Sequence, residues 1–82
     1  MHPSDREIAL RRLAAVEEAI VRARDHAARQ REIVERLEST GQDPSRARKL
    51  LATFEATQAN HEQRLAILLN ELTQRGWKHV PP

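Results

Sequence analysis

The chain has 82 residues, no cysteine, two glycines and only 2% aromatic residues. Alanine, leucine, glutamate and arginine dominate, a bias typical of long helices and unfavourable for a sheet. This length leaves room for one domain, and the lack of cysteine excludes disulfides and thiolate metal sites. Because 14 Lys and Arg nearly balance 12 Asp and Glu, the net charge of +2 by itself does not favour an acidic partner.

The first predicted helix begins with a capping signal. Ser4 and Glu7 stand in the S-x-x-E relation in which each side chain satisfies a free backbone N–H of the first turn. The apolar spacing predicts a helix over about residues 5–39. Steps of four and three define its inward stripe, which we call the seam. The seam positions of this helix are Ala9, Leu13, Val16, Ile20, Ala23, Ala27, Gln30, Val34 and Leu37.

A single strong interruption separates this helix from the next. Gly41 suits the left-handed residue that ends a helix, and Asp43 before Pro44 suits an N-cap followed by proline at the first helical position. We therefore expect a turn over residues 40–43 and a second helix over about residues 44–75. The seam of this helix consists of Ala47, Leu51, Phe54, Gln58, His61, Leu65, Leu68 and Leu72.

The end of the second helix is marked by Gly76, which begins a tail over residues 76–82. Trp77 occupies the position whose apolar side chain usually folds back onto the third residue from a helix end, here Leu72. The two prolines of the tail predict a short extended segment. The whole chain is thus predicted to be one all-α domain, an antiparallel, coiled-coil-like hairpin of two helices.

Folding the seams about Gly41 places Phe54 opposite Gln30, Leu68 opposite Val16 and Leu72 opposite Leu13. In this alignment both ends of the hairpin are apolar, and the middle carries a polar layer of Gln30, Gln58 and His61. Buried polar residues in a seam usually select one register at some cost in stability. We interpret the layer as a register device.

A second apolar set lies beside the seam and predicts self-association. Two helices alone cannot cover it, and one seam barely offsets the conformational entropy of so many ordered residues. A symmetric homodimer forming a four-helix bundle is the natural solution. A monomer with a few exposed apolar residues is the alternative. The set comprises Ile8, Ala15, Ala19, Ile33, Leu50, Ile67 and Leu69, with Leu10 and Val21 on the other side.

The charges indicate a solvated surface. Acids stand four residues before arginines in several places, as in Glu18–Arg22 and Asp25–Arg29, the favourable order on a helix. A modest basic strip remains, but phosphate binding favours an uninterrupted strip or interleaved aromatics, and the chain has neither. The leading interpretation therefore has no nucleic-acid partner, and nucleic-acid binding through this strip is the alternative. The strip would consist of Arg22, Arg24, Arg29, Arg31, Arg46, Arg48 and Lys49.

Catalytic and metal sites find little support. The chain has no glycine-rich phosphate loop and no nucleophile elbow, so we expect no enzyme and no cofactor. His61-Glu62 resembles the His-Glu pair of sensor-kinase dimerisation domains but lacks the proline that follows it there. His26 and His61 would need a third ligand to hold a metal.

One stretch resembles a known group. Residues 29–37, the Gly41-Gln42-Asp43 turn, residues 50–58 and His61 look like short bacterial helical-hairpin proteins of unassigned function. The likeness covers about half the chain and implies a bacterial cytosolic hairpin without a defined activity. The group often has a second histidine three residues after the first, where this chain has Arg64.

These patterns together predict a small self-associating interaction module, a scaffold, adaptor or regulator that binds itself or another helical protein. The longest apolar run, residues 65–69, is far shorter than the ~20 residues needed to cross a bilayer, and the N-terminus has no secretory signal pattern. We therefore expect a cytoplasmic protein without membrane contact.

Overall fold

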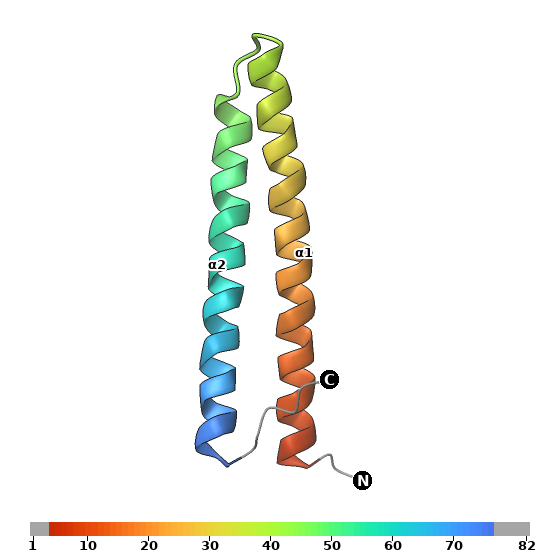
Figure 1. Ribbon diagram of the computed structural model, residues 1–82, viewed down its shortest axis with the longest axis vertical. Coiled ribbons are helices and arrows are strands. Elements are labelled where there is room, and N and C mark those ends of the chain that lie inside the picture. The colour runs from red at the N-terminus through yellow and green to blue at the C-terminus, as the bar shows by residue number, and fades with distance from the viewer. Residues whose placement is uncertain (1–3, 77–82) are drawn as a thin grey trace.

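The computed structural model describes residues 4–76 and consists of two antiparallel helices joined by a short loop (Figure 1). Helix α1 spans Asp5–Ser39 and helix α2 spans Ser45–Gln74, and this described part contains no strand. The expected all-helical hairpin is confirmed. Its extents of 57 × 24 × 21 Å make it an elongated rod. We call the loop end the tip and the end with both helix termini the open end.

The start of α1 follows from the Ser4 cap. Its hydroxyl oxygen accepts a hydrogen bond from the Glu7 N–H at 3.1 Å, which satisfies one of the free donors of the first turn. Two acids, Asp5 and Glu7, also lie in that turn, where the helix dipole favours negative charge. The local sequence is therefore sufficient to set this helix end.

The tip is built on a left-handed glycine. Gly41 has φ of 72°, its N–H donates to the Glu38 carbonyl at 3.3 Å, and the Gln42 N–H donates to the Leu37 carbonyl at 2.9 Å. This pair of bonds is the Schellman motif, which satisfies carbonyls that the helix end leaves free. A left-handed conformation was expected at Gly41, and the structure confirms it.

The start of α2 differs by one residue from the expectation. Pro44, and not Asp43, is the N-cap residue, with ψ of 4° and a carbonyl that accepts from the Arg48 N–H at 2.8 Å. Asp43 still serves the helix start, because its Oδ1 accepts from the Ser45 N–H at 3.0 Å and from the Ser45 hydroxyl at 2.6 Å. The Asp43 carboxylate thus accepts hydrogen bonds at the helix start from the residue that precedes the N-cap.

The C-terminal end of α2 carries the second left-handed glycine. Gly76 has φ of 77°, and its N–H donates to the Thr73 carbonyl at 3.0 Å. The expected contact of Trp77 with Leu72, and the extended tail after it, lie outside the described residues.

The register of the two helices corrects the sequence alignment by about one helical turn. The rings of His26 and Phe54 stack with centroids 5.5 Å apart, whereas the alignment placed Phe54 opposite Gln30. At the open end Ala9 and Leu72 line one hollow, whereas Leu72 was expected opposite Leu13. Each part of α2 therefore lies about four residues, roughly 6 Å, nearer the open end than expected.

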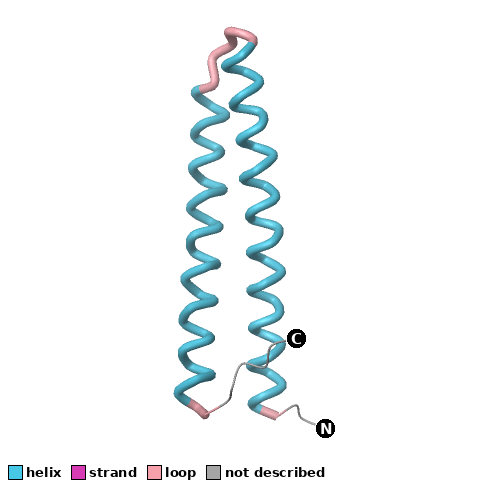
Figure 2. The backbone as a smooth tube through the Cα atoms, viewed as in Figure 1, coloured by secondary structure: helices cyan, strands magenta, loops and turns pink. Residues whose placement is uncertain are grey.

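The course of the loop explains this shift. The alignment assumed that the chain reverses symmetrically about Gly41. Instead the segment after Gly41 descends along the hairpin before α2 begins, so α1 extends beyond the start of α2 (Figure 2). Residues 42–44 take up about one turn of length in this way. The seam periodicity of each helix is unchanged by the shift, because sliding by about one turn brings equivalent faces together again.

Candidate interaction surface

The seam of the hairpin is covered unequally. Seven side chains of α1 are buried but only Leu72 of α2 is, since the α1 seam is rich in small residues and the α2 seam in large ones. Ala27, at 1% exposure, is the most enclosed. The large seam residues Leu51, Phe54, Leu65 and Leu68 of α2 are only half-buried. Two helices thus leave much of their best apolar surface in contact with water.

All ten apolar residues predicted for the core lie along the line where α1 meets α2. Four of them are buried in α1 and one in α2, and the rest are half-buried. The buried ones are Leu13, Val16, Ile20, Val34 and Leu72, and the half-buried ones are Leu37, Leu51, Phe54, Leu65 and Leu68. The same stripe continues at the open end with half-buried Ala9.

The three residues of the expected polar layer do not form one layer. Gln30 is buried, and its Nε2 donates to the Ala47 carbonyl of the facing helix at 3.0 Å. Gln58 is half-buried and donates to the Glu62 carboxylate of its own helix at 3.0 Å. His61 is half-buried, and no hydrogen bond of its side chain is found within residues 4–76. Of these three residues, only Gln30 therefore has a hydrogen bond to the facing helix within residues 4–76.

One side of the hairpin is closed by three ion pairs between the helices. Their nitrogen–oxygen distances are 2.9, 3.3 and 3.5 Å, and their members recur every seven residues on each helix, so they lie on one side of the seam. We call this side the ion-paired flank. Its pairs are Arg48–Glu38, Arg24–Glu62 and Arg31–Glu55.

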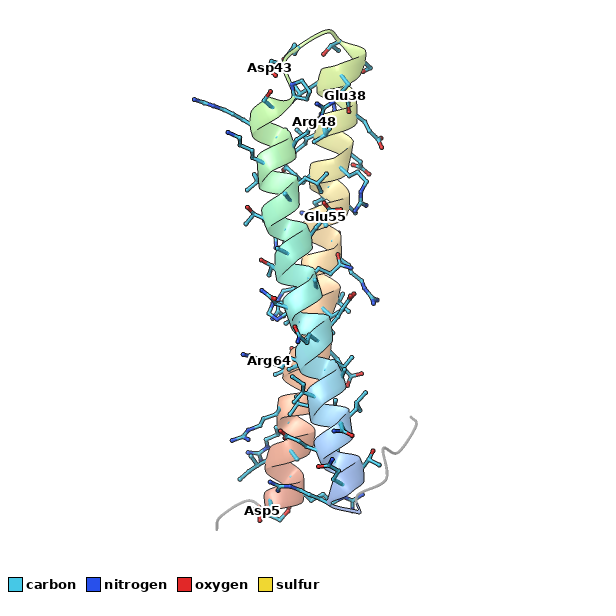
Figure 3. The ribbon with its side chains drawn as sticks, turned by 90° about the vertical axis from the view of Figure 1, so that its left-hand side faces the viewer. Asp5, Glu38, Asp43, Arg48, Glu55 and Arg64 are labelled. Carbon is cyan, nitrogen blue, oxygen red and sulfur yellow. The ribbon has the colours of Figure 1, made fainter. Side chains whose placement is uncertain are left out.

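These pairs orient the helices more than they stabilise them. Each member has 42–63% of its side chain exposed, and exposed pairs typically contribute less than about 1 kcal/mol. In Figure 3, Glu38, Arg48 and Glu55 lie between the two helices or to their right, whereas Arg64 projects from the left-hand edge. The side of Arg64 is thus the other flank of the hairpin.

The other side, which we call the open flank, carries a groove. The groove is shallow, has a volume of about 810 Å³ and lies in the half of the hairpin nearer the open end. Ala15, Val16, Ile67 and Leu68 form its apolar part, and Arg12, Arg64 and Glu71 its charged rim, together with Asn60 and Gln63. A smaller hollow of about 280 Å³ continues it to the helix ends.

The tip half of the open flank carries exposed apolar side chains beside a smaller hollow of about 270 Å³, which Ile33 helps to line. Ile33 lies 21 residues, three heptads, after the groove residue Arg12, and Leu50 lies two heptads before Arg64, so both belong to the same flank. Ile33 and Leu50 remain 40% and 45% exposed, and Ile67 at the groove is 53% exposed. Three of the five large apolar residues exposed in the described chain therefore share this flank. The other two, Leu10 and Val21, lie elsewhere.

Carboxylates interrupt the predicted basic strip. Arg22 and Arg29 pair with Glu18 and Asp25 at 3.9 and 3.1 Å, and Arg24, Arg31 and Arg48 belong to the ion-paired flank. Among the described residues, Arg46 and Lys49 of the strip make no ion pair within 4.0 Å. The structure therefore leaves two neighbouring cations near the tip and no continuous positive stripe.

Two carboxylates have altered acidity. Hydrogen bonds from Gln58 and then from Arg24 hold the pKa of Glu62 below its usual value. Hydrogen bonds from the Ser45 hydroxyl and backbone likewise lower the pKa of Asp43. Both carboxylates stabilise the hairpin in their ionised form, one across the two helices and one at the turn.

Sequence reasoning missed the cross-helix ion pairs and the His26–Phe54 stack. The ion pairs left a recognisable signal, since basic and acidic residues recur at seven-residue intervals in both helices. The stack left none, because it depends on the register. His26 and His61 do not form a metal site with further ligands, since residues 4–76 contain no group of three His, Cys, Asp or Glu able to hold an ion.

Neither helix in the described part of the chain is both long and apolar enough to cross a membrane. Comparison of the chain with protein-family models, with curated proteins and with solved structures gives no match. The surface itself defines the class of the molecule, a two-helix hairpin with one closed and one open flank.

Proposed function

We propose that this chain is a self-associating helical interaction module, in which two hairpins pack their open flanks together into a four-helix bundle. Its role is that of a scaffold or small adaptor without catalysis. The same flank also suits a helix of another protein, because it presents an apolar stripe of helical spacing. The apolar surface that the hairpin leaves uncovered is the observation that carries this proposal.

The size of that surface supports a partner. The chain exposes 6579 Å², whereas a compact monomer of its 9.4 kDa mass exposes about 5,000 Å². Its radius of gyration is 17.7 Å, against about 12 Å for a compact domain of this length. Packing two rods side by side reduces this excess, since each helix then buries a wider stripe.

Self-association is tested by the mass in solution. We expect light scattering and sedimentation equilibrium to give about twice the 9.4 kDa of one chain, with dissociation on dilution. Ile67→Glu places a charge beside the groove and is expected to give monomers. Val21→Glu is the matched control, because Val21 is 66% exposed and lies outside the open flank.

The result that refutes the proposal is equally clear. A monomeric mass for the parent chain at every concentration removes self-association, and loss of dimer in both variants removes the open flank as its site. Circular dichroism of each variant establishes that the helices are retained.

Nucleic-acid association remains the alternative. It would use Arg46 and Lys49 at the tip together with the arginines that now pair with carboxylates. Phosphate binding weakens steeply as salt increases, whereas an apolar interface holds or strengthens. Binding of a labelled oligonucleotide at 50 and 200 mM salt therefore separates the two functions. The existing ion pairs favour self-association, because phosphates would first have to displace them.

A further inference from the structure

The outward side of α2 carries almost no charge. Of the 16 residues exposed between positions 50 and 74, only Glu55, Arg64 and Glu71 are charged, whereas 16 of the 24 exposed residues of α1 are charged. Glu55 belongs to the ion-paired flank, and Arg64 and Glu71 belong to the rim of the groove. The exposed residues of α2 that lie opposite the seam from position 52 to position 74 are therefore all uncharged, and we call them the charge-free face. Its central line consists of Ala52, Ala56, Ala59, Gln63, Ala66 and Asn70.

The composition of this face indicates contact with protein and not with water. A helix face that remains in water normally carries charged side chains, as α1 does. Depletion of charged residues is the compositional mark of the centre of an interface. The face is also continuous with the groove, because Asn60, Gln63 and Ile67 belong to both. Two of the three large apolar residues exposed on the open flank, Leu50 and Ile67, come from α2. The exposed surface that lacks a partner is thus centred on α2.

The alanines of the charge-free face suit a second copy of the same helix. Ala52, Ala59 and Ala66 recur every seven residues and lie on one side of α2. Small side chains let two helix axes approach to the short end of the usual range of about 8–10 Å. Because Ala52 and Ala66 are both about 10.5 Å from Ala59 along the helix, a second α2 turned end for end about Ala59 sets alanine against alanine at all three levels. A twofold axis at Ala59 thus gives the self-complementarity that a symmetric interface requires.

Charged residues at the two ends of α2 decide the direction of the second copy. Arg46 and Lys49 at its start and Glu71 near its end make no ion pair within 4.0 Å among residues 4–76. Glu71 lines the groove and Arg46 stands three heptads before Ile67, which lines it too, so both lie on the open-flank side of α2. Arg46 stands 13 positions before Ala59 and Glu71 stands 12 positions after it, so the reversed copy brings Glu71 to Arg46 at both ends of the interface. A parallel copy would instead set the cations of one α2 against those of the other, which is unfavourable.

We propose that α2 is the inner helix of the dimer and docks through its charge-free face on α2 of a second copy, antiparallel, with the twofold axis at Ala59. This inference rests on the proposed self-association and names the helix that makes the contact. Leu50 of one copy then lies beside Ile67 of the other, because these residues stand nine positions before and eight positions after Ala59. Helix α1 lies on the outside of the dimer, where its exposed charges keep their contact with water.

A dimer centred on the outward side of α1 would be unfavourable. Arg22 and Arg29 lie there in ion pairs with Glu18 and Asp25, and each member has more than half of its side chain exposed. Burying such pairs removes charges from water at a cost that their mutual attraction often fails to offset. The charge-free face avoids this cost, since its polar members are threonine, asparagine and glutamine side chains that need only hydrogen-bond partners.

The absence of cysteine from the chain makes disulfide trapping a direct test. Ala59→Cys places a thiol beside its own copy on the twofold axis, so mild oxidation is expected to shift this variant from the 9.4 kDa monomer band to a band of twice that mass on a non-reducing gel. Ala52→Cys and Ala66→Cys are expected to form that band when they are mixed but not when each is alone. Ala28→Cys, at an exposed alanine of α1, is the matched control and is expected to stay at the monomer band.

A second pair of variants tests the same site without a disulfide. Ala59→Arg sets two cations against each other at the axis and is expected to lose the dimer in sedimentation equilibrium, whereas Ala28→Arg is expected to keep it. Both changes lie at exposed helical positions and introduce a strong helix former, so circular dichroism should show unchanged helicity.

The outcomes separate this inference from the proposed function. If the parent chain is a dimer but Ala59→Cys is trapped no faster than Ala28→Cys, or Ala59→Arg remains a dimer, α2 is not the inner helix and the inference fails while self-association stands. Trapping of Ala52→Cys with itself in preference to Ala66→Cys overturns the antiparallel direction. A monomeric mass for the parent chain at every concentration removes both proposals.

Discussion

Replacing Gly41 by alanine tests whether the hairpin depends on its left-handed turn. The residue has φ of 72°, and its N–H and that of Gln42 complete the Schellman motif that ends α1. A Cβ atom at this position meets no atom within 4 Å, so crowding contributes nothing. The substitution therefore isolates the cost of a left-handed backbone for an L-residue.

The expected loss of stability is about 1 kcal/mol. The left-handed conformation costs an L-residue roughly 1–2 kcal/mol, and the lower chain entropy of unfolded alanine offsets part of this cost. For a chain of this size, 1 kcal/mol lowers the melting temperature by about 4–8 °C. Thermal unfolding followed by circular dichroism at 222 nm, at one fixed protein concentration, measures the shift.

Two controls identify the cause. D-alanine at position 41, introduced by chemical synthesis, accepts positive φ and is expected to melt at least as high as the parent chain. Gly76→Ala imposes the same strain at φ of 77° but at the open end, where no chain reversal depends on it, so a smaller shift is expected. Equal melting temperatures for Gly41→Ala and the parent chain, or equal losses for both alanine enantiomers, would refute the reasoning.

The remaining predictions concern packing, the buried glutamine and acid sensitivity. Leu72→Ala, at a site 5% exposed, should lower the free energy of unfolding in urea by about 2 kcal/mol or more, whereas Leu10→Ala, at a site 42% exposed, should lower it by under ~0.5 kcal/mol. Similar losses for both variants would contradict the assignment of Leu72 to the buried seam. Gln30→Glu should lower the free energy of unfolding by about 1–3 kcal/mol at pH 7, because it sets a carboxylate against the Ala47 carbonyl, which accepts a hydrogen bond from Gln30 in the parent chain. An unchanged urea midpoint for this variant would contradict the prediction. Because the pKa of Glu62 is lowered in the folded chain, its carboxylate contributes its full stabilisation above the ordinary glutamate pKa. This contribution is lost as the pH falls through the pKa of the folded state. The melting temperature should therefore fall between about pH 5 and pH 3. Glu62→Gln should show a smaller fall, and an identical pH profile would exclude this carboxylate as a source of acid sensitivity.

The sequence by itself determined the two helices, their ends to within one residue, and the stripe on each that meets the other. Ser4 with Glu7 and the Gly41 turn act through bonds within a few residues, so local chemistry is enough to specify them. The seam from Leu13 to Leu72 is likewise visible in the sequence, because a helix repeats its faces at intervals that apolar residues must follow.

Only the tertiary structure decided the register and the difference between the two flanks. The register depends on the path of residues 42–44, and helical periodicity permits slides of about one turn without exposing the seam. Once α2 lies lower by that turn, Phe54 reaches His26, the basic and acidic ladders meet at Arg24–Glu62 and its neighbours, and the groove is left on the opposite flank. These features arise from contacts between residues far apart in the chain, whose energies depend on the alignment of whole helices and not on any local pattern.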